Sequence, residues 1–208
     1  MTEVTQMTDQ PQPAETAVNG KPKKHILVAL VENKPGVLNR VASLFRRRNF
    51  NVDSLTVGRT HRPYISRMTI GVDASRADAR RIASNLFKLI NVIDVSIVSQ
   101  EPYVSRDLAL IKVRANDAES RNTITMLCDR YPARIVDIGP EVAIIEIAAQ
   151  EDQVESLIQE VERLGIVELV RTGVVAMGRG VRILDSNYEP VVPVTVSSDR
   201  QSYQVYGV

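Results

Sequence analysis

The sequence has little of the side-chain chemistry on which most enzyme active sites depend. Its 208 residues include one cysteine, Cys128, and two histidines, His25 and His61. A single cysteine excludes an intrachain disulfide and a metal site built from several cysteines. Two histidines leave little material for a metal centre or for histidine-based acid–base catalysis.

Neither sign of charge is in clear excess, and no apolar run is long. The formal net charge is +1, whereas dedicated nucleic-acid binders normally show a clear basic excess. The longest apolar runs, 25–31 and 142–149, are much shorter than the roughly 20 residues that span a bilayer. Residues 1–20 lack the basic start and apolar core of a secretory signal and contain no arginine. We therefore expect a cytoplasmic protein with a disordered leader over residues 1–23.

Hydrophobic periodicity predicts two units with the same order of elements. In the first unit, strands are expected at 25–32, 51–58, 65–73 and 92–99, and helices at 36–48 and after an N-cap at Ser75. In the second unit, strands are expected at 108–114, 133–138, 142–149 and 166–171, and helices at 117–130 and 151–164. The order β-α-β-β-α-β is that of the ferredoxin-like fold, which places the chain in the α+β class with two such domains in tandem.

The two units look like a diverged internal repeat. A constant shift along the sequence places Val28 on Ile111, Leu30 on Val113 and Asn33 on Asn116. The second helix of the first unit is expected to bury a stripe made of Ile82, Leu86, Leu89 and Ile90. After Gly173 the pattern fades. We therefore expect domains at 24–100 and 101–180, followed by a tail over 181–208.

The turn after the first predicted strand has the features of a small-ligand site. It delivers the N-terminus of the first predicted helix, where free N–H groups and the helix dipole favour an anion. Gly36 allows close approach to the backbone, and the amides of Asn33 and Asn51 are expected to reach the same point. This combination predicts binding of a free α-amino acid. Apolar residues would line the pocket for its side chain: Val37, Leu38, Val57 and Ile65.

The second unit provides an internal comparison for this turn. Glu119 stands where the repeat places Gly36, and Arg134 stands where it places Asn51. A carboxylate at the first of these positions would repel the carboxylate of a ligand. If the turn were needed only for folding, the second unit should keep it. The comparison favours a site in the first unit, and a turn that binds nothing is the alternative.

Several stretches of the chain resemble the regulatory (small) subunit of acetolactate synthase, also called acetohydroxyacid synthase. These stretches are residues 26–48, 51–57 and 66–70, the pair Arg121-Asn122 and the ending over 171–180. The resemblance extends from about His25 to Arg182, and it is most specific in the strings around Asn33 and Met68.

The resemblance implies a regulatory role in which this chain performs no catalysis. The first domain would be an ACT domain that pairs with that of a second copy and binds a branched-chain amino acid between them. The chain would activate a separate catalytic subunit and confer feedback inhibition, typically by valine. Thiamine diphosphate, Mg and FAD would belong to that partner, and this chain would have no cofactor, metal or catalytic residue. Carried over to matching positions, the effector site would comprise Asn33, Gly36, Val37, Leu38, Asn51 and Val57.

Proteins of other functional classes share this order of elements or this kind of site. RNA-binding sheets stack bases on aromatic residues of their central strands, and the predicted strands at 26–32 and 65–72 have none. A small hydrolase of this fold would need an arginine or histidine in the first loop, which has neither. A free-standing amino-acid sensor that regulates a different partner is the alternative, and the protein that co-purifies with the chain would discriminate between the two.

Overall fold

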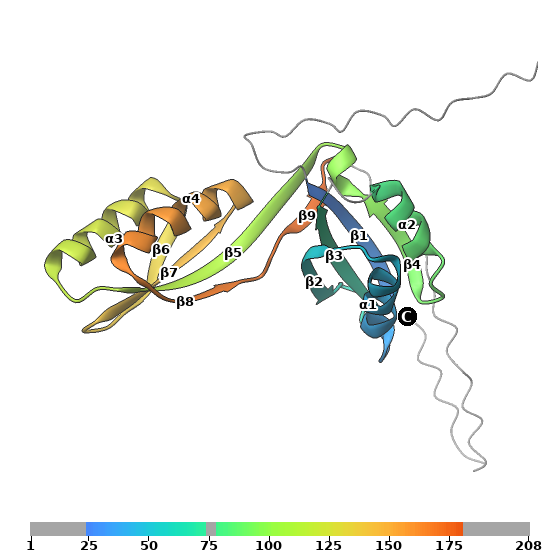
Figure 1. The fold of residues 1–208 in the computed structure, drawn as a ribbon, viewed down its shortest axis with the longest axis horizontal. Helices are drawn as coiled ribbons and strands as arrows, with labels where there is room; N and C mark the ends of the chain where they lie inside the picture. The colour runs from blue at the N-terminus through green and yellow to red at the C-terminus, as the bar shows by residue number, and fades with distance from the viewer. Residues whose placement is uncertain (1–23, 74–77, 181–208) are drawn as a thin grey trace, which may run out of the picture.

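The structure, a computed structural model, describes residues 24–73 and 78–180. These residues form two units (Figure 1). The first unit comprises β1 (Lys24–Glu32), α1 (Val37–Arg48), β2 (Val52–Arg59), β3 (Ile65–Asp73), α2 (Ala79–Phe87), β4 (Val92–Ile97) and the short 3-10 helix η1 (Val98–Gln100). The second comprises β5 (Tyr103–Arg114), α3 (Ala118–Arg130), β6 (Ala133–Ile138), β7 (Val142–Ala149), α4 (Glu151–Val161), η2 (Glu162–Leu164) and β8 (Ile166–Arg171), and β9 (Val175–Gly178) follows. The predicted leader, the predicted N-cap Ser75 and the predicted tail over 181–208 lie outside the described residues.

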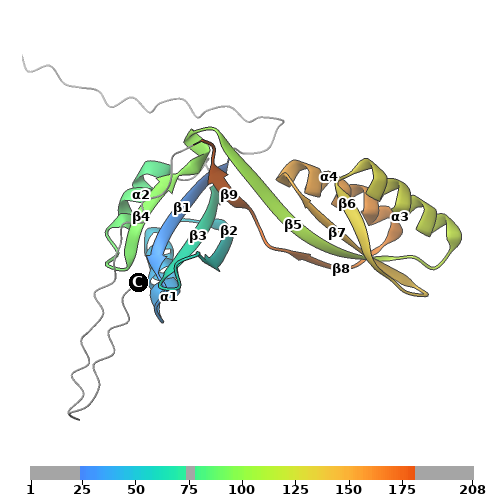
Figure 2. The same cartoon turned by 180° about the vertical axis from the view of Figure 1, so that it is seen from behind.

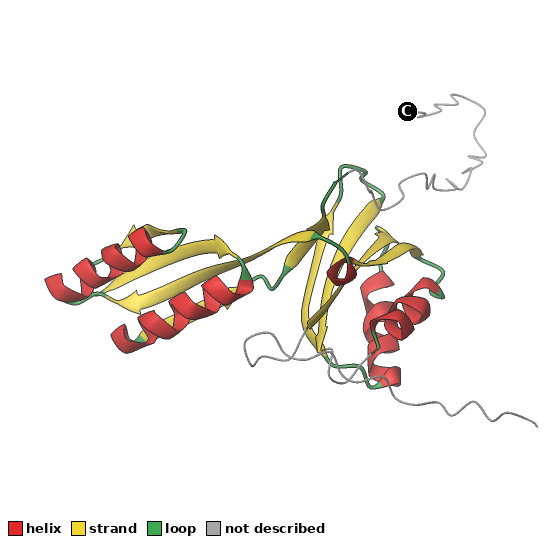
Figure 3. Ribbon diagram, turned by 90° about the horizontal axis from the view of Figure 1, so that it is seen from above, coloured by secondary structure: helices red, strands yellow, loops and turns green. Residues whose placement is uncertain are grey.

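Each unit is built around an antiparallel sheet with two helices on one face. The strand orders are β2-β3-β1-β4 and β6-β7-β5-β8, which confirms the predicted fold class of two tandem ferredoxin-like domains. In the first unit, side chains of α1 and α2 pack against one face of β1 at Leu27, Ala29 and Val31. Figure 3 shows both of these helices on the same side of the sheet.

The second helix of the first unit is shorter than predicted. Its N-cap is Asp78, whose side chain accepts a hydrogen bond from the Arg80 backbone N–H at 2.9 Å. Ile82 and Leu86 are buried as expected, but the helix ends at Phe87. Ile90 lies beyond this end and is 86% exposed. The predicted apolar stripe extended beyond the end of the helix, because residues 88–91 form the turn that leads into β4.

A strand that the sequence pattern did not predict covers the second face of the first sheet. β9 pairs with the first residues of β5, from Tyr103 opposite Gly178 to Arg106 opposite Val175. β5 therefore begins earlier than the expected strand at 108–114. This ribbon packs over Ile26 and Val28 of β1, together with Val174, Ala176 and Val98. β1 is thus buried on both faces, which explains its uninterrupted apolar run.

β5 belongs to both units. Its first residues pair with β9 against the first sheet, and its remaining residues form a central strand of the second sheet. Figures 1 and 2 show this strand running from one unit into the other, with β8 and β9 returning alongside it. The connection between the units is therefore a pair of strands rather than a single linker.

The alignment of the first strand of one unit with the first strand of the other differs by one residue from the alignment that the sequence repeat predicted. Both strands have an irregularity where they pair with the last strand of their unit, at Leu30/Val31 in β1 and at Lys112/Val113 in β5. In this register Ile111 corresponds to Ala29, which faces the helices, and not to Val28, which faces β9. A slip of one residue exchanges the two faces of a strand. The pattern could not reveal the slip because β1 is apolar on both faces.

Candidate functional site

The N-terminus of α1 is open. Gly36 is its N-cap, with φ +82°, and no side chain caps the helix. The first turn contains no acidic residue. A Cβ added at Gly36 would meet no atom within 4 Å. The left-handed conformation explains why glycine stands here, and the free helix end provides an anion site with space in front of it.

Asn33 holds the turn in place. Its Nδ2 donates to the Pro63 carbonyl oxygen at 2.8 Å, and its backbone N–H donates to the Tyr64 carbonyl oxygen at 2.8 Å. The side-chain NH2 that the sequence suggested as a ligand contact thus ties the β1–α1 turn to the β2–β3 loop. The amide oxygen of Asn33 is the group that could accept a hydrogen bond from a ligand ammonium.

The predicted apolar wall divides into buried and exposed members. Val37 is 4% exposed and belongs to the core, whereas Leu38 is 47% and Val57 is 44% exposed. Val57 pairs with Met68, a core residue on the helix-covered face, so it lies on the same side of the sheet as α1. Ile65 lies on the other face, two residues before Arg67 and three before Met68, and it is not part of this wall.

Asn51 does not reach the same point as Asn33 within one chain. α1 separates the two residues, because Asn33 precedes its start and Asn51 follows its end. A helix of 12 residues is about 18 Å long. The expectation that both amides meet within the chain was therefore wrong. A site that contains both requires a second copy of the chain.

The corresponding turn of the second unit is closed by its own carboxylate. The N-cap of α3 is Asp117, which accepts hydrogen bonds from the Ser120 backbone N–H at 2.7 Å and from Ser120 Oγ at 2.8 Å. The hydrogen bonds from Ser120 lower the pKa of Asp117. Asp117, and not Glu119, thus takes the place of Gly36 at the helix N-cap. An anion site that is open in the first unit is occupied in the second by the chain itself.

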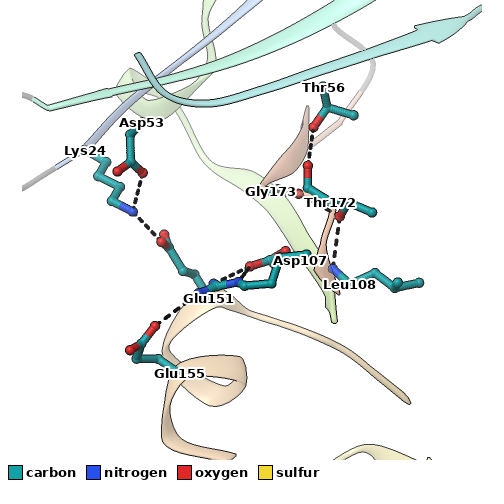
Figure 4. A network of polar contacts seen from close by, with 10 residues as sticks. Lys24, Asp53, Thr56, Asp107, Leu108, Glu151, Glu155, Thr172 and Gly173 are labelled. Carbon is teal, nitrogen blue, oxygen red and sulfur yellow. Dashed lines mark hydrogen bonds and ion pairs between the residues drawn. The ribbon is translucent and has the colours of Figure 1, made fainter. Parts of the chain in front are cut away.

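A network of polar contacts links β2 to the second unit (Figure 4). Lys24 Nζ lies 2.6 Å from Asp53 Oδ2 and also pairs with Glu151, at the start of α4. Partial burial lowers the pKa of Lys24, but the hydrogen bonds to Asp53 and Glu151 and the attraction of these two negative charges together raise it by more. Thr56 Oγ1 donates to the Thr172 carbonyl oxygen at 3.1 Å. The strand that carries Val57 therefore also contacts the segment between β8 and β9.

A buried ion pair fixes the end of β8 to β5. Asp107 is 1% exposed, and its Oδ2 accepts from Arg171 Nε at 2.9 Å and from Arg171 Nη2. Arg171 Nη1 also lies 3.2 Å from Glu155 Oε2 on α4. Sequence reasoning missed this cluster, since its members are distant in the chain. The only local signal was an aspartate directly before the apolar strand expected at 108–114.

The reactive side chains singled out by the sequence have ordinary structural surroundings. Cys128 packs against the core of the second unit, and burial raises the pKa of its thiol, so it lacks the thiolate character of a nucleophile. His61 is exposed in the β2–β3 loop. None of the helices in the described part of the chain combines the length and apolar character that crossing a membrane requires.

Comparison with known proteins assigns both units. Residues 27–94 match the family model described as the AHAS small subunit-like ACT domain, and residues 106–180 match that described as the small subunit of acetolactate synthase. The probable acetolactate synthase small subunit of Archaeoglobus fulgidus is 49% identical over 157 residues, which cover 76% of this chain and 98% of that protein. The acetolactate synthase small subunit of Mycobacterium bovis is 45% identical over 161 residues, covering 77% and 95%.

A solved structure supports the same assignment. The crystal structure of the acetolactate synthase small subunit from Thermotoga maritima has 37% sequence identity and a TM-score of 0.68, covering 77% of this chain and 99% of that one. Relatives of this similarity, matched over nearly their whole length, agree with both family models. This chain therefore belongs to the family of acetolactate synthase small subunits, and its first domain is an ACT domain.

Proposed function

We propose that this chain is the cytoplasmic, non-catalytic regulatory subunit of an acetolactate synthase in branched-chain amino-acid biosynthesis. It activates a separate catalytic subunit, which carries the thiamine diphosphate, Mg and FAD. A branched-chain amino acid bound at the ACT domain inhibits the complex. The observation that carries this proposal is the open, glycine-capped N-terminus of α1 beside the exposed side chains of Leu38 and Val57.

A dimer formed through β2 would complete the effector site. β2 is an edge strand of its sheet, and an exposed edge can pair with a second copy about a two-fold axis. In an antiparallel pairing, the start of one β2 lies beside the end of the other. Asn51 of the partner subunit then approaches the end of β2 that carries Val57, which is also the end where Asn33 and Gly36 lie. The predicted residues form one site across two chains.

The site would recognise each part of the effector by different groups. The α1 N–H groups donate hydrogen bonds to the carboxylate, while the amide oxygens of Asn33 and of the partner subunit's Asn51 accept hydrogen bonds from the ammonium group. Leu38, Val57 and the edge of Val37 contact the branched side chain. Valine, leucine and isoleucine differ by one methylene or its position, which is worth only about 1–3 kcal/mol in such a pocket.

β2 could transmit effector binding to the second domain because its two faces contact different parts of the molecule. Val57 lies on the face toward α1, and Thr56 lies on the opposite face, where it bonds to Thr172. Ser54 packs against Gly173, where an added Cβ would lie 2.8 Å from Ser54 Cβ. An effector that binds two arrangements of β2 unequally shifts their populations, with a coupling free energy of about 1–3 kcal/mol in typical cases.

The direct test combines calorimetry with an activity assay. The full chain is titrated with valine, leucine and isoleucine, and acetolactate formation by the catalytic subunit is then measured with and without the chain and each amino acid. We expect saturable binding, higher activity with the chain, and inhibition by the amino acid that binds best. Binding without any effect on acetolactate formation, together with co-purification of another protein, would favour the free-standing sensor instead.

Gly173→Ala tests the transmission through β2. Alanine at φ +78° would be strained, and its Cβ would press on Ser54. The contact between β2 and the segment that joins β8 to β9 must therefore open. We expect amino-acid affinity to stay within about threefold of wild type while inhibition of the complex is lost, because the coupling of about 5–150-fold depends on this contact. Gly178→Ala is the matched control, since its added Cβ meets no atom within 4 Å and its φ is ordinary. Equal inhibition in both variants would contradict this route.

A further inference from the structure

A groove lies on the face of the first sheet that α1 and α2 leave free. Its volume is about 900 Å³. The floor is formed by side chains of β1 and β3, including Leu30 and Ile65. The β2–β3 loop forms one wall, and the ribbon of β5 and β9 forms the other. Figure 3 shows this ribbon on the side of the sheet opposite the helices.

The groove is basic, and no acidic side chain among the described residues that line it offsets its charge. It is lined by Arg59, Arg62, Arg67 and Arg106, and none of the described residues that line it carries a carboxylate. Among the ion pairs between described residues, none includes these four arginines. This contrasts with Lys112, Arg130 and Arg134 of the second unit, each of which has a carboxylate partner.

Arg67 is partly removed from solvent and has no carboxylate partner among the described residues. It is half-buried in β3, where its Nη2 donates to the Ala176 carbonyl oxygen at 2.7 Å. Burial lowers the pKa of its guanidinium, and no nearby carboxylate offsets this effect. A partly desolvated cation is stabilised by an anion that hydrogen-bonds to it. The positive charge of Arg67 in the groove is thus not balanced by a negative charge from the described residues.

The walls are apolar between the arginines. Val104, Val175 and Met177, on the β5–β9 ribbon, line the groove with 37%, 42% and 65% of their surfaces exposed. Arginine and methionine are enriched in protein–protein interfaces, and arginine is prominent among the residues that dominate binding energy. An occupant that fits this groove must present carboxylates to the rim and apolar side chains to the walls.

We infer that this groove docks a segment of the catalytic subunit that carries carboxylates beside apolar side chains. The inference rests on the proposed function, which supplies the partner, and concerns a surface separate from the effector site at α1. A second copy of the chain fits poorly, because a two-fold contact through this face would bring the four arginines of each copy together. Nucleic acid fits poorly as well, because the described residues that line the groove include no Phe, Tyr or Trp on which bases could stack.

Arginine footprinting tests the location directly. The full chain is treated with phenylglyoxal, alone and with excess catalytic subunit, and the modified peptides are quantified by mass spectrometry. Arg59 and Arg106 are exposed and are expected to react in the free chain and to be protected at least about fivefold in the complex. Arg81, exposed on α2, should react equally in both samples. Unchanged reactivity in the complex, or protection already present in the free chain, would overturn the inference.

Two variants test the energetics. Arg106→Glu reverses a rim charge and Met177→Asp places a carboxylate on the apolar wall, and each is expected to weaken binding of the catalytic subunit at least about tenfold. Arg81→Glu makes the same charge change on the helix side and should alter binding less than about twofold. Calorimetric binding of valine should be unchanged in all three. Losses no larger than that of Arg81→Glu, or an altered oligomeric state of the free chain, would overturn the docking site.

A wild-type chain that binds valine but no catalytic subunit would overturn the inference and the proposed partner, whereas failure to bind valine alone would count only against the effector site.

Discussion

Gly36→Asp is expected to abolish branched-chain amino-acid binding, whereas Gly36→Asn should still bind the amino acid with moderately reduced affinity. The two side chains have nearly the same size and both tolerate the left-handed conformation that Gly36 adopts, with φ +82°. Neither should clash, because a Cβ at this position meets no atom within 4 Å. The difference between the variants therefore isolates the charge at the helix N-terminus.

The expected loss of affinity is large because aspartate would oppose effector binding in two ways. Its carboxylate would hydrogen-bond to the free N–H groups of α1, as Asp117 does at the start of α3, and so would occupy the place of the effector carboxylate. Two like charges about 4 Å apart repel by about 4 kcal/mol at an effective dielectric constant of 20. We expect a loss of about hundredfold or more in affinity, and a loss of about tenfold or less for asparagine.

Isothermal titration calorimetry of both variants against valine measures this difference. Circular dichroism and sedimentation confirm that each variant is folded and has the oligomeric state of wild type. The Gly36→Asp variant should still activate the catalytic subunit but resist inhibition. Equal affinities for the aspartate and asparagine variants would show that the effector carboxylate binds elsewhere.

Arg171→Met is expected to destabilise the second domain by about 3 kcal/mol. The substitution keeps an apolar stem but leaves Asp107, which is 1% exposed, without its cation. Removing one partner of a buried pair typically costs 3–5 kcal/mol, because the other charge stays buried and uncompensated. We expect the lower end of this range, since the Arg171 side chain is 28% exposed. Asp107 Oδ1 already has no hydrogen-bond partner among the described residues, which leaves little local compensation.

Arg134→Met is the matched control for this ion pair. Arg134 also pairs with a carboxylate, Glu146, at 2.8 Å, but its side chain is 72% exposed. Exposed ion pairs contribute little to stability because solvent screens the two charges, so this variant should stay close to wild type. Urea unfolding monitored by circular dichroism measures both free energies. A difference of less than about 1 kcal/mol between the two variants would mean that Asp107 is hydrated in the folded chain.

Local sequence features predicted most of the secondary structure. The apolar run at 142–149, the apolar residues Val41, Leu44 and Phe45, and the Gly36 turn each lie within a few residues, and the structure has the corresponding strand, helix and helix cap. β9 was missed because a strand of four residues that ends at Gly178 offers too short a pattern. Its stability comes from β5 and from the apolar face of β1, neither of which lies near it in the sequence.

The sequence by itself determined the two ferredoxin-like units, the family, and the difference between an open first turn and an acidic second one, because these depend on periodicity and on short motifs. Only the tertiary structure decided which distant residues meet. It separated Asn51 from Asn33 by the length of α1, paired Asp107 with Arg171, and placed Arg67 in a groove beside β9. Such contacts depend on the register of strands and on the crossing of one strand between two units. A one-residue slip reverses these relations without changing the hydrophobic pattern of a strand that is buried on both faces.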